Sequence, residues 1–308
     1  MDFHHISVLL TECIEGLNIR ADGVYVDGTA GGAGHSSEIA KRLSQNGKLI
    51  ALDQDPQAVL IATQRLKDYK NAYVIHSNFT YMGDVLHDMQ IENVDGVLLD
   101  LGVSSHQLDV LERGFSYKSD APLDMRMSMQ GISAKDIVNS YSLNELTRIL
   151  NEYGEEKFAR RIAFNIIKKR ETAPIETTGQ LADIVKASIP AALKREKNPC
   201  KKTFQAIRIA VNSELDSLSE GLDAAFYSLK SGGRLAIITF HSLEDRMVKQ
   251  RYNSWCQGCT CPSDFPICVC NNKPKGKLIN KKPIIASEEE LEVNKRSKSA
   301  KLRIIEKI

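Results

Sequence analysis

Four short apolar segments in the first hundred residues constrain the fold more than any other feature of this chain. They cover residues 24–27, 48–53, 73–76 and 94–100. Three of them end in an aspartate, and polar stretches with helical character, such as residues 36–43 and 55–66, lie between them. Strands that alternate with helices build βαβ units, and these assemble into a mostly parallel sheet. The chain is therefore predicted to be an α/β protein.

Composition and cysteine content place the chain among ordinary globular proteins of a reducing compartment. Hydrophobic residues make up 42% of the 308 residues and charged residues 26%, which excludes global disorder and a collagen-like chain. The formal net charge of +2 indicates no general preference for nucleic acid. The longest apolar run, residues 235–240, is too short to cross a bilayer, and no signal peptide is visible. Seven cysteines, an odd number, do not suggest a disulfide framework, so we expect a cytoplasmic protein.

A gap of 133 residues, from 101 to 233, separates the fourth expected strand from a fifth at residues 234–241. A crossover between parallel strands needs only about a dozen residues. One long amphipathic helix accounts for part of the gap and is expected to end at Gly232–Gly233. Its apolar stripe comprises Phe204, Ile207, Val211, Leu215, Leu218, Leu222, Phe226 and Leu229.

The remainder of the gap carries further helix signals and no persuasive strand. Two segments, beginning at Ser142 and Thr177, open with the spacing of a capping box, and Gly154 is typical of a helix stop. We therefore predict an inserted α-helical domain, residues 109–200, between the two parts of an α/β domain. Those parts are residues 1–108 and residues 201–308, and the second ends in a Cys-rich loop (256–270) and a basic tail.

The glycine-rich segment DGTAGGAGHS, residues 27–36, lies between the first expected strand and the first helix. Its four glycines let a ligand approach the backbone closely. A P-loop would need lysine where His35 stands, and a dinucleotide motif would need glycine where Ser37 stands. S-adenosylmethionine requires neither residue. A tight turn without a ligand is the remaining alternative.

Three side chains near the ends of the following strands sharpen this choice. Asp53 is placed to accept hydrogen bonds from ribose hydroxyls, and Phe79 could cover one face of an adenine. Asp100 ends the fourth strand, beside the crevice where ligands of open α/β sheets bind. Each has an ordinary structural explanation, because strand-end aspartates often cap turns and single phenylalanines usually lie in the core. Their placement on successive strand ends favours a nucleoside-like ligand.

Long blocks of sequence show which family the chain resembles. They are HISVLL at 5–10 with Glu12, the glycine-rich segment at 27–36, DQDPQA at 53–58, DLGVSSHQLDVLERGFSYKSDAPLDMRM at 100–127, GEE at 154–156, TFQAIRI at 203–209, FHSLEDR at 240–246 and NKRSKSAKLR at 294–303. In this order they resemble the MraW family of bacterial small-subunit ribosomal RNA methyltransferases H, across nearly the whole chain.

The resemblance implies a Rossmann-like class I methyltransferase domain, dependent on S-adenosylmethionine and interrupted by a helical insert. It also implies methylation of the exocyclic N4 of a cytosine, position 1402 in the decoding region of 16S rRNA. The family's cofactor positions correspond to Ala33, Gly34, His35, Asp53, Phe79, Asp100 and Gln107. Other members carry glycine where this chain has Ala33, which suggests that this position does not demand a positive φ.

The cytosine amine is a poor nucleophile, because its lone pair is delocalised into the ring. The enzyme must orient it and accept the charge and proton that develop on nitrogen. The candidates for holding the cytosine are Asp100, Asp124, Arg126 and His241. A local Asp124–Arg126 ion pair and a histidine satisfied at a strand end are the structural alternatives.

Contact with 16S rRNA in the small ribosomal subunit would use local basic surface, and the target base must be unpaired or flipped out. The candidate residues, besides lysines of the basic tail, are Lys157, Arg160, Arg161, Lys168, Lys169, Arg170, Lys194, Arg195, Lys197, Lys201 and Lys202. Many such charges only solvate a surface. We expect no membrane partner, and the sequence leaves a homodimer open.

Five cysteines fall within the Cys-rich loop: Cys256, Cys259, Cys261, Cys268 and Cys270. Close thiols in a reducing compartment suggest a structural zinc ion bound by four of the five. The C-x-C spacings differ from the usual C-x2-C pairs, so a loop of free or redox-labile thiols is the alternative.

Three other functions remain consistent with parts of the sequence. One is an amino-methyltransferase acting on another RNA or DNA cytosine, and another is a zinc-stabilised RNA-binding assembly protein. The third is a nicotinamide oxidoreductase, which the incomplete dinucleotide motif at Ser37 disfavours.

Overall fold

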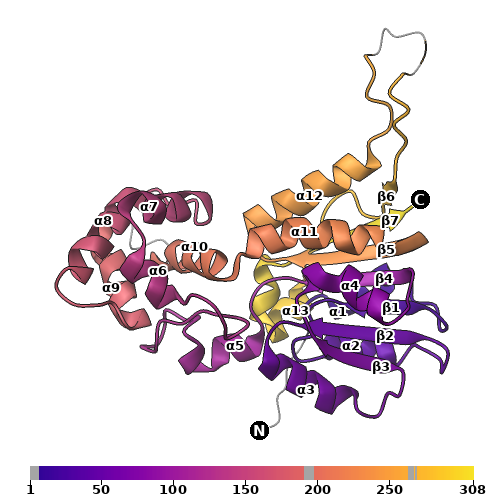
Figure 1. Cartoon of the computed structure of the whole chain (residues 1–308), viewed down its shortest axis with the longest axis horizontal. Coiled ribbons are helices and arrows are strands. Elements are labelled where there is room, and N and C mark those ends of the chain that lie inside the picture. The colour runs from indigo at the N-terminus through magenta and orange to yellow at the C-terminus, as the bar shows by residue number, and fades with distance from the viewer. Residues whose placement is uncertain (1–6, 191–197, 263–266, 268) are drawn as a thin grey trace. The chain divides into compact units, whose positions relative to one another are not determined.

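The computed structural model describes residues 7–190, 198–262, 267 and 269–308, and it divides the chain into two compact units (Figure 1). The first unit comprises Met1–Gly102 and Leu215–Ile308, and the second is the intervening Val103–Glu214. Among the described residues, none of the helices combines the length and the apolar character needed to span a bilayer.

The first unit is built on a seven-stranded sheet with strand order β3-β2-β1-β4-β5-β7-β6. Its strands are β1 (Val24–Asp27), β2 (Lys48–Asp53), β3 (Ala72–His76), β4 (Val94–Asp100), β5 (Leu229–Thr239), β6 (Gly276–Leu278) and β7 (Lys301–Lys307). Strands β1 to β5 pair in parallel, whereas β7 is antiparallel to both β5 and β6. The predicted α/β class is confirmed. The parallel pairing also brings the carboxyl ends of β1, β2 and β4, each an aspartate, to one edge.

Alternate residues of the central strands face two different layers of helices, as expected for a sheet buried on both sides. Val26, Ile50 and Leu99 belong to one core cluster, whereas Tyr25 and Leu49 belong to the other. The first cluster includes residues of η1 (Phe79–Tyr81), α4 (Met82–Asp88), α11 (Glu214–Tyr227) and α12 (Ser242–Cys256). The second includes residues of α1 (Leu10–Leu17), α2 (Gly34–Ala40) and α3 (Pro56–Leu66).

The prediction of one long helix ending at Gly232 is wrong, because Ser213 interrupts it. Helix α10 (Cys200–Asn212) ends at Ser213, whose φ of 47° is left-handed, and α11 follows at the next residue. Helix α10 packs in the second unit, whereas α11 contributes to the core of the first. Gly232 lies inside β5, which begins at Leu229 rather than at 234.

The segment interpreted as a basic tail contributes two strands, β6 and β7, to the sheet. After α13 (Glu288–Val293) and η4 (Lys295–Ser299), strand β7 inserts between β5 and β6. Leu302 and Ile305 of β7 are fully buried. Two of its charged residues pair with Asp245 of α12: Lys301 Nζ lies 3.0 Å from Oδ2, and Arg303 Nε lies 2.7 Å from Oδ1.

The second unit is helical and has a core of its own. It contains α5 (Ser105–Asp109), η2 (Leu111–Arg113), α6 (Ala134–Ser140), α7 (Leu143–Glu152), α8 (Ala159–Arg170), α9 (Thr178–Ser188) and α10. The predicted capping boxes at Ser142 and Thr177 open α7 and α9, and α7 ends two residues before Gly154. The unit is wider than residues 109–200, because Val103 and Leu108 on one side and Ala210 on the other pack against its core.

Candidate active site

The connection between β1 and α2 is a tightly folded loop with left-handed backbone. Gly31 and Ala33 have φ of 49° and 57°, and Ala33 is the buried N-cap residue of α2. The expectation that position 33 does not demand a positive φ is therefore wrong. A left-handed conformation costs a residue with a Cβ roughly 1–2 kcal/mol, so this chain carries strain that a glycine would relieve.

Asp27, at the end of β1, fixes the start and the end of this loop. One carboxylate oxygen accepts a hydrogen bond from the Ser36 hydroxyl at 2.6 Å, and the other accepts from the Thr29 N–H at 3.1 Å. Burial raises the pKa of Asp27 to about 6, and these hydrogen bonds oppose the shift. Asp27 is thus a structural support of the loop.

Asp53, at the end of β2, joins the loop to the neighbouring strand. Its carboxylate accepts hydrogen bonds from the Gly31 N–H at 2.7 Å and from the Asp55 N–H at 2.8 Å. Burial raises the pKa of Asp53 to about 6. Each oxygen keeps a further lone pair, so the carboxylate can still accept hydrogen bonds from a ligand.

Asp100, at the end of β4, has a buried oxygen without a partner. Its Oδ1 has no hydrogen-bond partner within the described structure, although its backbone N–H donates to the Thr29 hydroxyl oxygen at 2.6 Å. Burial, followed by the negative charges of Asp27 and Glu244, raises the pKa of Asp100 to about 8. An unsatisfied carboxyl oxygen at a strand end is typical of a group that awaits a cationic or hydrogen-bonding ligand.

His35, in the first turn of α2, is neutral and faces Asp100. Burial lowers the pKa of His35 to about 4. Its Nε2 lies 3.0 Å from the carbonyl oxygen of Val8, which can only accept, so Nε2 carries the proton. The unprotonated Nδ1 lies 3.8 Å from Oδ2 of Asp100.

The Phe79 side chain lies within the core of the first unit and is only 9% exposed. Its ring packs so closely against Gly221 of α11 that a Cβ at position 221 would overlap it. Sequence reasoning missed Gly221, because a single glycine in a helical pattern gives no signal of what packs against it. The expected contact of Phe79 with an adenine stays a prediction.

His241 is the N-cap residue of α12, two residues after the end of β5. Its Nδ1 accepts a long hydrogen bond of 3.4 Å from the Glu244 N–H. Its buried Nε2 lies 3.1 Å from Oε1 of Glu244 but is not aligned for a hydrogen bond. Oε2 of Glu244 accepts from the backbone N–H groups of Phe240 and His241, at 2.8 and 3.2 Å. Glu244 is therefore a buried carboxylate that the sequence analysis did not single out.

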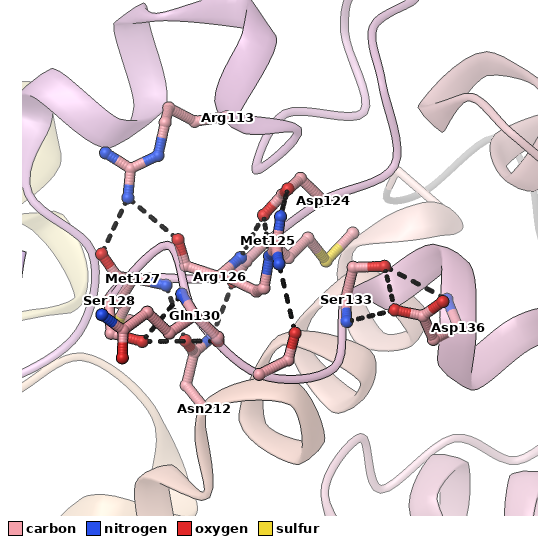
Figure 2. A network of polar contacts seen from close by, with 11 residues as sticks. Arg113, Asp124, Met125, Arg126, Met127, Ser128, Gln130, Ser133, Asp136 and Asn212 are labelled. Carbon is pink, nitrogen blue, oxygen red and sulfur yellow. Dashed lines mark hydrogen bonds and ion pairs between the residues drawn. The ribbon is translucent and has the colours of Figure 1, made fainter.

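In the second unit, Asp124 and Arg126 form a local ion pair (Figure 2). Arg126 Nη2 lies 2.6 Å from Oδ2 of Asp124, and Nε donates to both carboxylate oxygens. Arg126 Nη1 also donates to the carbonyl oxygen of Gly131 at 3.1 Å. The structural alternative considered for this pair is thus present, and a catalytic role for it stays a prediction.

The backbone around this pair is held by two side chains from other parts of the unit (Figure 2). Arg113 Nη2 donates to the carbonyl oxygens of Arg126 and Met127, both at 2.9 Å. Asn212 of α10 accepts from the Met127 N–H at 2.7 Å and donates to the Met125 carbonyl oxygen at 2.8 Å. Met125 has a φ of 63°, so these bonds fix a strained loop.

The other predicted site residues are dispersed. Gln107 of α5 is buried in the second unit, where its side chain closes a capping box with Ser104. Among the five candidate metal ligands, Cys259, Cys261 and Cys270 come together, and Cys256 ends α12. Cys268 lies outside the described residues.

Comparison with known proteins shows to which family the chain belongs. The model of the family described as "MraW methylase family" matches residues 2–308. The chain belongs to the MraW methylase family. The resemblance stated from the sequence blocks is therefore confirmed.

Curated relatives match over their whole length. A protein of Clostridium botulinum named "Ribosomal RNA small subunit methyltransferase H" is 55% identical over 309 residues, which cover 100% of both chains. A protein of the same name from Brevibacillus brevis is 54% identical over 311 residues, covering 100% of this chain and 99% of the relative. Agathobacter rectalis has a relative named "Ribosomal RNA small subunit methyltransferase H 2" at 55% identity and the same coverage.

The family and the sheet together establish a class I methyltransferase that uses S-adenosylmethionine. The carboxyl groups at the edge of the sheet are suited to binding that cofactor. Asp100 offers a buried carboxyl oxygen that lacks a partner, and Asp53 retains acceptor capacity beside the glycine-rich loop. A ligand with a cationic amino group and two ribose hydroxyls matches those two acceptors.

Proposed function

We propose that this methyltransferase transfers a methyl group from S-adenosylmethionine to the exocyclic N4 of a cytosine in the decoding region of small-subunit ribosomal RNA. The substrate class is supported by identity of 55% over the full length of a relative named for that RNA. For the chemistry, the supporting observation is the unpartnered Asp100 oxygen beside the glycine-rich loop.

Four groups of the first unit would hold the cofactor. Asp53 accepts hydrogen bonds from the ribose hydroxyls, and Asp100 pairs with the cationic amino group. The loop Ala33–Gly34–His35 gives the ligand close access to the backbone, and Phe79 covers one face of the adenine. Gln107 of the second unit is proposed as a further contact.

The bound sulfonium supplies an activated methyl group. The cytosine N4 lone pair forms the new C–N bond as the C–S bond breaks, and N4 then loses a proton. Asp100 and His241 are the proposed groups for orienting the amine, because a carboxyl oxygen and an imidazole nitrogen there are buried without an aligned hydrogen bond. Asp100 is the proposed acceptor of this proton, since the cationic amino group of the bound ligand favours its ionised form. Asp124 and Arg126, held in one geometry by their ion pair, are proposed to contact the cytosine from the second unit.

An exposed face of α8 supports binding to RNA. Arg160, Arg161, Phe164 and Lys168 fall on one side of this helix, and Phe164 is 56% exposed. None of the three cations forms an ion pair with a carboxylate that the structure describes. An aromatic ring among cations suits a nucleic acid, because the ring stacks on a base while the cations bind phosphates.

Two other basic candidates are engaged in hydrogen bonds within the protein, and three are not described. Arg170 Nη1 donates to the carbonyl oxygen of Val138 at 2.8 Å, and Lys202 Nζ donates to that of Glu155 at 2.6 Å. Lys194, Arg195 and Lys197 lie outside the described residues.

The test is transfer of labelled methyl groups to small ribosomal subunits isolated from a strain that lacks the endogenous enzyme. Wild type is compared with Asp53→Ala, Asp100→Ala and the control Asp88→Ala, whose carboxylate is exposed at the end of α4. We expect one N4-methylcytidine in the decoding region, formed by wild type and the control only. Methylation of a different RNA or of DNA, with these subunits unlabelled, would contradict the proposed substrate.

A further inference from the structure

The connection between α12 and β6 extends away from the sheet as two segments without regular secondary structure, which lie side by side (Figure 1). Near the sheet, the two segments are joined by hydrogen bonds to main-chain carbonyl oxygens. The Asn272 side chain donates to the carbonyl oxygens of Gln257 and Gly258, at 3.1 and 2.8 Å, and the Lys275 N–H donates to that of Trp255 at 2.7 Å. Beyond these bonds, the described residues of the connection bury little apolar surface, since Ile267 and Val269 are 75% and 67% exposed.

Three thiols from the two sides of this connection meet. The Sγ atoms of Cys259, Cys261 and Cys270 all lie within 4.8 Å of one another, and those of Cys259 and Cys270 are 3.7 Å apart. Zinc binds thiolate sulfur tetrahedrally at about 2.3 Å, which places two bound sulfurs about 3.8 Å apart. The distance between the Cys259 and Cys270 sulfurs therefore matches that of two sulfurs bound to one zinc ion, and the Cys261 sulfur lies close to both.

Backbone N–H groups point at these sulfurs. The Thr260 N–H donates to Cys270 Sγ at 3.3 Å, and the Asn272 N–H donates to the same sulfur at 3.5 Å. The Val269 N–H donates to Cys261 Sγ at 3.3 Å. Hydrogen bonds of this kind stabilise the negative charge of a thiolate and orient it for a metal, as groups around known metal sites do.

We propose that Cys259, Cys261 and Cys270 supply three of the four ligands of one zinc ion, which fastens the two sides of the connection to each other. The site is structural, because these three thiolates belong to the α12–β6 connection and not to the strand ends that hold the cofactor. A metal supplies the stability that so small an exposed segment cannot obtain from buried apolar surface.

Cys256 is excluded from the site, although the sequence offered it as a ligand. It is the last residue of α12, and its side chain packs against the apolar cluster that includes Trp255. Its sulfur is not among the three that come together. Cys256 therefore provides a matched control with the same residue type three positions from the first ligand.

The experiment measures bound metal in the full-length protein, purified under reducing conditions, by elemental mass spectrometry. Wild type and Cys256→Ser should carry about one zinc per chain. Cys259→Ser, Cys261→Ser and Cys270→Ser should each retain less than a tenth of it at the same zinc concentration. Added Co²⁺ should produce a thiolate-to-cobalt charge-transfer band in wild type and Cys256→Ser, and not in the three variants.

Three outcomes would overturn the proposal. Wild type could take up neither zinc nor cobalt, or Cys256→Ser could lose metal as completely as the others. Intact mass could instead reveal a Cys259–Cys270 disulfide in protein free of metal. Thermal unfolding of each variant separates loss of the metal from loss of the fold, because the sheet is expected to melt as in wild type.

Discussion

The backbone N–H of Asp100 donates to the side-chain oxygen of Thr29 at 2.6 Å, which links the end of β4 to the loop that follows β1. The same loop is anchored to β2 by Asp53. One hydroxyl and one carboxylate thus hold three strand ends and the glycine-rich loop in a common geometry, before any ligand is bound.

Replacing Thr29 by valine should therefore damage the cofactor site. The substitution keeps the shape of the side chain but leaves the partly buried Asp100 N–H without its acceptor, at a cost of about 1 kcal/mol of stability. We expect weaker binding of S-adenosylhomocysteine in calorimetry. Thr29→Ser, which retains the hydroxyl, is the control and should bind as wild type does. Equal binding by the valine variant would show that the bond does not position Asp100.

The raised pKa of Asp100 predicts a specific pH dependence of stability. The folded state holds a proton up to about pH 8, whereas the unfolded carboxyl releases it near its ordinary pKa of 3.8. The folded state therefore binds more protons across this range, and the free energy of unfolding falls as pH rises, by up to about 1.4 kcal/mol per unit.

Asp100→Asn should remove this dependence. Urea unfolding of the ligand-free protein between pH 6.5 and 8 isolates the effect, because Asp27 and Asp53 have pKa values of about 6 and titrate mostly below that range. We expect the stability of the asparagine variant, relative to wild type, to increase with pH. The exposed substitution Asp88→Asn serves as control. Parallel curves for Asp100→Asn and wild type would contradict the raised pKa.

Gly221→Ala should be destabilising although alanine favours helices. The added methyl would overlap the Phe79 ring, and overpacking of this kind costs about 1–3 kcal/mol. Gly83→Ala in α4 is the matched control, since a Cβ there meets nothing within 4 Å and should be neutral or stabilising by up to about 1 kcal/mol. Chemical denaturation compares the two. If both alanine variants are more stable than wild type, the Phe79 ring can move aside without cost and the prediction fails.

The exposed face of α8 can be tested by its salt dependence. Replacing Arg160 or Lys168 by glutamine should reduce the slope of log affinity against log salt by about 1 for small-subunit RNA. Phe164→Ala should weaken binding by about 1–3 kcal/mol without changing that slope. Lys48→Gln, an exposed lysine at the amino end of β2, is the control. If the slope is unchanged in both charge variants, the cations of α8 do not contact the RNA.

The sequence predicted β1, β2 and β4 well, because each is a largely buried apolar run that ends in an aspartate. Segments 24–27, 48–53 and 94–100 match β1, β2 and β4. Strand β7 was missed, because its lysines and arginine dominate the local composition while their partner, Asp245, lies far away in the chain. Charge counts along a sequence carry no information on which charges are paired.

The remaining differences concern single backbone conformations. Ser213 and Ala33 adopt left-handed φ values, which neither serine nor alanine predicts from sequence. In the candidate site, the sequence correctly placed Asp53 and Asp100 at the ends of two strands, β2 and β4. It could not indicate that Asp100 has an oxygen without a partner, or that Gly221 supports Phe79, since both depend on packing between distant segments.

The position of β7 between β5 and β6 has a consequence during synthesis. Strand β5 exposes one edge, and β6 has no neighbour, until residues 301–307 have emerged from the ribosome and inserted between them. A nascent or truncated chain that stops before residue 301 therefore presents an open, apolar strand edge, which is a template for aggregation. A separate peptide carrying the β7 sequence would be expected to close that edge in trans and to rescue such a fragment.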